Sequence, residues 1–134
     1  MIEQTLAIIK PDGVLKGVAQ KIRQRYPEAG LRLIKEKVTL LEITVAKKLY
    51  REHHGKVFFE GLVLSMVSGP IVAILLEGED AIKKVRALHG ATDPAKAEPG
   101  TIRHDFRSAG GPFNTVHASD SPEAAAREIK LFFG

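Results

Sequence analysis

The chain has 134 residues, of which 44% are hydrophobic and 27% charged. This is typical of a soluble protein with one core, so we expect a single domain over residues 1–134. It contains no cysteine, which excludes disulfides, cysteine-ligated metals and a thiol nucleophile. The net charge of +4 suits anionic partners such as nucleotides, nucleic acid or anionic lipid. The basic residues are scattered, however, and predict no dedicated nucleic-acid site.

No apolar run in the sequence has the length that a membrane-spanning segment needs. The N-terminal stretch MIEQTLAIIKPDG lacks the basic and apolar regions of a signal peptide and leads directly into a strand pattern. We therefore expect a cytoplasmic protein without membrane contact.

The first third of the chain predicts two strands with a helix between them. Thr5–Lys10 is a short apolar run closed by the turn signal PDG, a pattern typical of a buried strand. Apolar residues at a spacing of four predict a helix over 14–26, which we expect Pro27 and Gly30 to end. The partly alternating segment 31–41 predicts the second strand.

The middle third predicts a pair of helices, a strand and another helix. We expect Thr44 to cap a helix that extends to His53, and the segment 58–69 to form the second helix of the pair. The apolar segment 70–78 predicts a third strand. The segment 79–90 predicts a helix with acidic residues at its start and a glycine after its end.

The last third combines a long irregular segment with a short strand and a helix. The segment 91–113 has no clear periodicity, although 101–106 within it resembles a strand. We expect a strand over 114–117 and a helix that begins at Ser121-Pro122. Irregular segments of this length in compact domains are usually functional or disordered. This one contains Arg103, and we expect it to be functional.

The order of these elements predicts an α+β fold of the ferredoxin-like kind. Its pattern is β-α-β-β-α-β with a helical insertion, a four-stranded antiparallel sheet with helices on its faces, and a long active-site loop.

Three cations could converge on that loop. Lys10 ends an apolar strand, Arg86 lies at the edge of the buried face of its helix, and Arg103 lies within the loop. Each of them alone is more often a solvated or paired structural residue. Together they would form a phosphate clamp, because guanidinium groups hold phosphate oxygens in bidentate fashion.

His117, in the segment NTVHASDS, is either a structural histidine or a nucleophile. Glu128 borders the apolar stripe of the last helix. It is either an exposed residue or an acceptor that holds His117 in one tautomer. The five histidines show no metal-binding spacing. If a metal is used, we expect Mg²⁺ that arrives with substrate phosphates and needs no dedicated protein site.

Five segments together resemble nucleoside diphosphate kinases of the bacterial and archaeal type. They are IIKPDG, FFEGLV, SGPIVAILLEGEDAI, LHGATDPAKAEPGTIRHDF and NTVHASDS, and the resemblance extends from Glu3 to Phe133. It implies the ferredoxin-like fold and transfer of a γ-phosphoryl group from a nucleoside triphosphate to a nucleoside diphosphate. It also implies a phosphohistidine intermediate with ping-pong kinetics, magnesium on the nucleotide phosphates, broad base specificity (ATP, GTP, ADP, GDP and others) and a homo-oligomer, either a tetramer or a hexamer.

The resemblance also implies a role for each matching residue. His117 would be the nucleophile, with Glu128 and Ser119 supporting it and Tyr50 packing beside it. The nucleotide would be held by six residues, with Lys10 and Asn114 on the ribose, Lys10 also near the transferred group, Arg86, Thr92 and Arg103 on the distal phosphates, and Phe58 against the base.

Two other functions are compatible with parts of the sequence. Ferredoxin-like domains also serve as catalytically silent ligand-binding modules, but that function gives no reason for these cations, Asn114 and His117 to occur together. The basic charge is compatible with a nucleic-acid binder, which would need aromatic residues on an open sheet face. Only 6% of this chain is aromatic.

Overall fold

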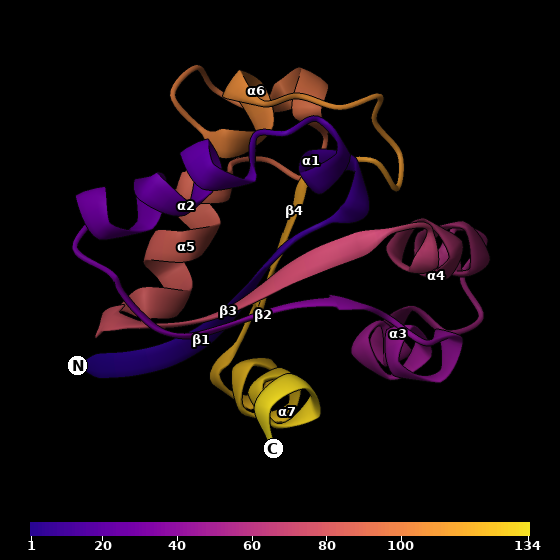
Figure 1. The fold of residues 1–134 in the computed structure, drawn as a ribbon, viewed down its shortest axis with the longest axis horizontal. Coiled ribbons are helices and arrows are strands. Elements are labelled where there is room, and N and C mark those ends of the chain that lie inside the picture. The colour runs from indigo at the N-terminus through magenta and orange to yellow at the C-terminus, as the bar shows by residue number, and fades with distance from the viewer.

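The computed structural model describes residues 1–134 and confirms the α+β fold (Figure 1). Its strands are β1 (Ile2–Ile9), β2 (Arg32–Leu40), β3 (Pro70–Glu79) and β4 (Val116–Ala118). They form one sheet in the order β2-β3-β1-β4, in which each neighbouring pair is antiparallel. The sheet therefore has the ferredoxin-like arrangement that the order of elements predicts.

The helices occupy the connections between these strands. Their bounds are α1 (Pro11–Leu15), α2 (Ala19–Glu28), α3 (Ile43–Leu49), η1 (Arg51–His53), α4 (Phe59–Val67), α5 (Ala81–His89), η2 (Pro94–Lys96), α6 (Ile102–Asp105) and α7 (Pro122–Phe133). Figure 1 shows α2, α5 and α6 on one side of the sheet and α7 on the other, with α3 and α4 at one end. No helix is both long and apolar enough to cross a membrane.

Two apolar clusters hold these layers together, one on each face of the sheet. On β1, Leu6 and Ile8 belong to the cluster with α3, α4 and α7. Ala7 and Ile9 belong to the cluster with α2, α5 and α6. This division follows from the alternation of side chains along a strand. Because every residue from Leu6 to Ile9 is fully buried, the strand sequence is continuously apolar, as the strand prediction required.

The predicted helix over 14–26 is divided in the structure, and Pro27 does not end it. Gly17 has a φ of +75° and separates α1 from α2. Pro27 lies inside α2, where it removes only one intrahelical N–H near the end of the helix. Gly30, the other expected stop, does turn the chain just after the helix, with a φ of +84°.

Two of the predicted helix starts are also wrong by a few residues. Glu42, not Thr44, is the N-cap residue of α3, because its backbone is extended and its carbonyl accepts the N–H of Ala46. The acidic residues expected at the start of α5 lie before that helix. Glu79 still pairs with Ile2 in the sheet, and Asp80 turns the chain with a φ of +48°.

The long segment between α5 and β4 contains a helix where the sequence pattern resembles a strand. Thr101 caps α6 by accepting a hydrogen bond from the N–H of His104, so that residues 102–105 are helical. Strand β4 begins at Val116, two residues later than predicted, because Thr115 has a φ of +74° and cannot continue an extended strand.

Gly90, at the end of α5, lets this segment pass close to Thr101. Its φ is +87° and its ψ is −175°, a conformation that is nearly exclusive to glycine. A Cβ atom at this position would lie 2.6 Å from Oγ1 of Thr101. Both the backbone conformation and the space therefore require glycine.

We predict that Gly90→Ala lowers the free energy of unfolding by about 2–5 kcal/mol, because backbone strain and steric overlap add. Gly100→Ala is the matched control, since Gly100 has a φ of +94° and nothing within 4 Å of an added Cβ. The free energy of unfolding of Gly100→Ala should fall by only about 1–3 kcal/mol, because this variant adds backbone strain without steric overlap. Urea unfolding of both variants measures the difference, and equal losses would show that the overlap with Thr101 costs nothing.

Candidate active site

A cavity of about 630 Å³ lies where the end of β1 meets β4. Nine of the ten residues singled out from the sequence line it, namely Lys10, Tyr50, Phe58, Arg86, Thr92, Arg103, Asn114, His117 and Glu128. The tenth, Ser119, is buried behind it and donates a hydrogen bond of 2.9 Å to Oε1 of Glu128. The fold thus brings residues from six separate parts of the chain to one place.

His117 reaches this cavity because of its register in the sheet. It pairs with Ile8 of β1, and directly opposed residues of an antiparallel pair project from the same face. That face is covered by α3, α4 and α7, because Ile8 belongs to their apolar cluster. Tyr50 packs edge-on against the His117 ring with 5.5 Å between the ring centroids.

The two ring nitrogens of His117 have different surroundings. Nε2 lies 2.7 Å from Oε1 of Glu128, a carboxylate that is only 3% exposed. Because an ionised carboxylate only accepts hydrogen bonds, this contact assigns the proton of the neutral ring to Nε2. Nδ1 then carries the lone pair, and no protein group bonds to it. The site therefore presents one imidazole nitrogen that can act as a nucleophile.

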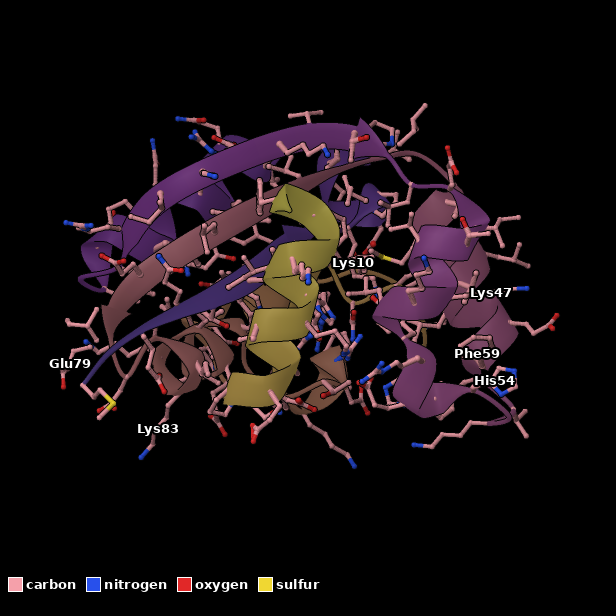
Figure 2. All side chains as sticks on the ribbon, turned by 90° about the horizontal axis from the view of Figure 1, so that it is seen from below. Lys10, Lys47, His54, Phe59, Glu79 and Lys83 are labelled. Atoms are coloured by element: carbon pink, nitrogen blue, oxygen red, sulfur yellow. The ribbon has the colours of Figure 1, made fainter.

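Lys10 is the most deeply buried cation of the site. It is 1% exposed, and Figure 2 shows it in the interior of the molecule, whereas Lys47 and Lys83 lie at the periphery. Its Nζ donates to the carbonyl of Pro112 at 2.6 Å and to Oδ1 of Asn114 at 2.9 Å. Burial lowers the pKa of Lys10 to about 8, an effect that the negative charge of Asp12 partly opposes.

Arg103 is partly buried among backbone carbonyl groups. Its guanidinium donates to the carbonyls of Asn114, Gly90 and Val116 at 3.2, 2.9 and 2.8 Å. Burial, followed by repulsion from Arg86, lowers the pKa of Arg103 to about 10. Two of its five N–H groups have no protein acceptor. Arg103 therefore links α5 to β4 and still has donors left for an anion.

Arg86, Thr92 and Phe58 lie at the open side of the cavity. Arg86 and Thr92 are exposed, and the Arg86 side chain makes no hydrogen bond or ion pair within the protein. The carbonyl of Thr92 accepts a hydrogen bond from Nδ2 of Asn114. Phe58 is 53% exposed and packs against the His53 ring at 5.2 Å. Its ring is a flat apolar surface that a planar ligand could cover.

A turn at Thr115, which no sequence pattern indicates, orients this site. Val116 N–H donates to the carbonyl of Asn114 at 2.8 Å, which closes a tight turn around Thr115 with its φ of +74°. Such turns are rare and strained. Asp12 stabilises this one by accepting the Thr115 N–H at 2.8 Å, and Lys10 N–H donates to the Thr115 carbonyl at 2.9 Å. Asp12 was visible in the sequence only as part of a turn signal.

Pro112, His53 and His89 also line the cavity, and sequence reasoning did not assign them to it. His89 is fully buried, and its Nε2 lies 2.7 Å from the Tyr26 hydroxyl. Burial lowers the pKa of His89 well below its ordinary value, with a further contribution from Arg103. His89 is therefore neutral and adds no charge to the site. Its apolar helix position offered no signal that distinguishes it from a core residue.

The carboxylates of the cavity do not form a metal-binding cluster. No group of three or more His, Cys, Asp or Glu side chains is placed to hold a metal ion. Of the three carboxylates that line the cavity, Glu128 bonds to His117 and Glu52 pairs with Arg127. Asp120 is the remaining one.

The chain matches the family model described as nucleoside diphosphate kinase over residues 3–134. It is 52% identical to a nucleoside diphosphate kinase of Caldanaerobacter subterraneus subsp. tengcongensis, with 98% of this chain and 94% of that protein covered. Among solved structures, a nucleoside diphosphate kinase of Aquifex aeolicus superposes with a TM-score of 0.96 at 42% identity, covering 100% of this chain and 96% of that one.

A halophilic nucleoside diphosphate kinase of Halobacterium salinarum, solved in complex with CDP, superposes with a TM-score of 0.94 at 41% identity. The alignment covers 99% of this chain and 88% of that one. These similarities confirm the resemblance to bacterial and archaeal members and the fold that it implied.

We predict that Lys10 of the free protein loses its proton near pH 8, measured by NMR on ¹³C-labelled lysine, with Lys10→Met identifying the resonance. Because its pKa in the folded chain is about 8 against an ordinary 10.5, the unfolded chain holds this proton more tightly. The part of the free energy of unfolding that is due to Lys10 should therefore increase as the pH rises from about 8 to 10.5. This increase should be absent in Lys10→Met. A titration midpoint near 10.5 would contradict the burial argument.

Proposed function

Because the chain belongs to the nucleoside diphosphate kinase family and is a phosphotransferase of that class, we propose that it works by a ping-pong route through a phosphohistidine at His117. The observation that carries this proposal is the hydrogen bond between Nε2 of His117 and Glu128, which leaves Nδ1 with its lone pair inside a cavity lined by Lys10, Arg86 and Arg103. The alternatives of a silent binding module and a nucleic-acid binder find no support among relatives named as kinases.

In the first half-reaction, Nδ1 attacks the γ-phosphorus of a nucleoside triphosphate. The N–P bond forms, the bond between the γ-phosphorus and the bridging oxygen breaks, and the nucleoside diphosphate leaves with the bond electrons. The positive charge that develops on the imidazole is stabilised by the Glu128 carboxylate at Nε2, while Ser119 fixes that carboxylate. In the second half-reaction, a terminal phosphate oxygen of another diphosphate attacks the phosphohistidine and restores the free ring.

The remaining residues position the nucleotide and balance its charge, which is most of what phosphoryl transfer requires of a protein. Lys10 and Asn114 are joined by a hydrogen bond of 2.9 Å and would bind the ribose, with Lys10 also near the transferred group. Arg86, Thr92 and the free N–H groups of Arg103 would bind the distal phosphates. Tyr50 limits the motion of the His117 ring by edge-on packing.

We propose that Mg²⁺ enters the site on the nucleotide phosphates. The donors present fit such an ion, because Asp120 is the one lining carboxylate that is not already paired. When bound, the ion neutralises charge on the phosphate oxygens. The protein's own cations would then complete the neutralisation.

We also propose a homo-oligomer, a tetramer or a hexamer, located in the cytoplasm, where nucleotide pools are found. Strand β2 lies at an open edge of the sheet, and Ile34, Val38 and Leu40 on it are exposed. An unpaired edge with apolar side chains favours association with a second copy of the chain. Light scattering of the purified protein gives the number of chains, and cell fractionation gives the location.

We predict that the protein mixed with γ-³²P-labelled ATP, without acceptor, takes up label at His117. The label should be acid-labile and base-stable, as expected for a phosphoramidate, and any nucleoside diphosphate should discharge it. Two-substrate kinetics should give parallel double-reciprocal lines. His117→Ala should keep nucleotide binding and lose label and turnover together, and label on Ser119 or Ser121 would disprove the assignment.

We predict that Phe58→Ala raises the KM for purine and pyrimidine nucleotides alike. Stacking on an aromatic ring is worth about 1–3 kcal/mol and does not depend on the edge of the base, so the rise should be roughly 5- to 150-fold. Phe58→Tyr, which keeps the ring, is the control. Steady-state kinetics with four diphosphates checks the prediction, and an effect confined to one base would contradict it.

A further inference from the structure

Arg127 of α7 connects the two walls of the active-site cavity, and the mechanism above gives it no role. Its NH1 group donates to the carbonyl of Lys48 at 2.9 Å, and its NH2 group pairs with the carboxylate of Glu52. The same NH2 group lies 3.7 Å from Oε2 of Glu128. The Arg127 side chain is only 20% exposed, so this ion pair is partly shielded from solvent.

The two partners of Arg127 enclose a functional segment. Lys48 lies in the last turn of α3 and Glu52 in η1, so they lie on either side of Tyr50 in the sequence. The chain then continues to Phe58 and α4. We call residues 43–67, which comprise α3, η1 and α4, the hairpin. Tyr50, Glu52, His53, Phe58 and Leu62 of this hairpin line the cavity opposite His117 and Glu128.

No other side chain fixes the hairpin in this way. The remaining side-chain hydrogen bonds of residues 43–67 stay inside that segment or reach only the adjoining Ser68. Its other contacts with the protein are ring and apolar packing, namely Tyr50 against His117 and the apolar cluster with the sheet and α7. Apolar packing is non-directional, whereas a guanidinium donates along fixed directions. Arg127 is therefore the one directional link that fixes the hairpin relative to the helix carrying Glu128.

We propose that Arg127 is a positioning residue that holds the hairpin against α7 and so sets the distance between the Phe58 wall and His117. This inference rests on the proposed role of Phe58 in binding the base. Loss of the link should weaken binding of the nucleoside part, whereas chemistry at His117 should be retained, because Nε2 bonds to Oε1 of Glu128 and not to the oxygen facing Arg127.

The test is a set of matched variants studied by steady-state kinetics. Arg127→Met keeps the apolar length of the side chain and should raise the KM for nucleoside diphosphates about tenfold with kcat within twofold. Glu52→Gln, at a half-exposed position, should also raise the KM for nucleoside diphosphates, but by a smaller factor. Arg23→Met is the control, since Arg23 makes a comparable pair with Glu36 on α2 and β2, and its KM should not change.

A double-mutant cycle with Phe58 distinguishes a hairpin role from a general loss of stability. In the Phe58→Ala background, Arg127→Met should have little further effect on KM, because the wall that it positions has been removed. An undiminished effect there, a fall in kcat instead of a rise in KM, or an unchanged KM in Arg127→Met would each overturn the inference. If Phe58→Ala alone leaves KM unchanged, the stacking role of Phe58 is wrong instead. Labelling of His117 by ATP tests the phosphohistidine separately, because it depends on neither Arg127 nor Phe58.

Discussion

The partly buried guanidinium of Arg103 joins the two ends of the chain segment on which the candidate site depends. Its three hydrogen bonds to the carbonyls of Gly90, Asn114 and Val116 join the end of α5 to the residues on either side of the strained Thr115. Lys10 and Asp12 hold the same long segment between α5 and β4 from the side of β1, whereas Arg103 holds it from the side of α5. The Arg103 charge interacts with backbone dipoles and not with a carboxylate. It helps to position Asn114 and His117 and, through Asn114, also Lys10.

This arrangement has an electrostatic consequence. Neither Lys10 nor Arg103 forms a salt bridge, and burial lowers the pKa of both. Buried cations without a counter-ion are unfavourable in the free protein. An anionic ligand removes part of that cost when it binds, so the site is arranged for phosphate groups at some expense to the stability of the empty fold. The neutral state of His89 limits this cost, because a third buried positive charge would increase the repulsion.

The strained turn at Thr115 and the Arg127 link act on opposite walls of the same cavity. The turn, held by Asp12 and by the backbone of Lys10, orients the wall that carries His117. Arg127 holds the wall that carries Tyr50 and Phe58. In both cases a few directional hydrogen bonds define geometry that apolar packing alone leaves adjustable.

The sequence by itself determined the elements that depend on local pattern. The continuous apolar run of β1, the alternation that separates Leu6 and Ile8 from Ala7 and Ile9, and the order of strands and helices were sufficient for the fold class. The motifs that resemble the family selected ten candidate residues, which the fold brings together. The break at Gly17 and the helix start at Glu42 were missed, and Pro27 was wrongly expected to end a helix, because the backbone angles of single residues, set by their neighbours in space, decide these boundaries.

Only the tertiary structure decided how the site residues are oriented. A threonine at φ +74° runs against the preference of a β-branched residue, so no local rule predicts the turn at Thr115. It is maintained by Asp12, 103 positions away in the chain. The use of Arg103 on carbonyl groups, the assignment of Nε2 of His117 to Glu128, and the contact of Arg127 with Lys48 and Glu52 likewise join distant segments. Such contacts exist only once the chain has packed, because their geometry is set by the sheet and its helices and not by the residues on either side of them.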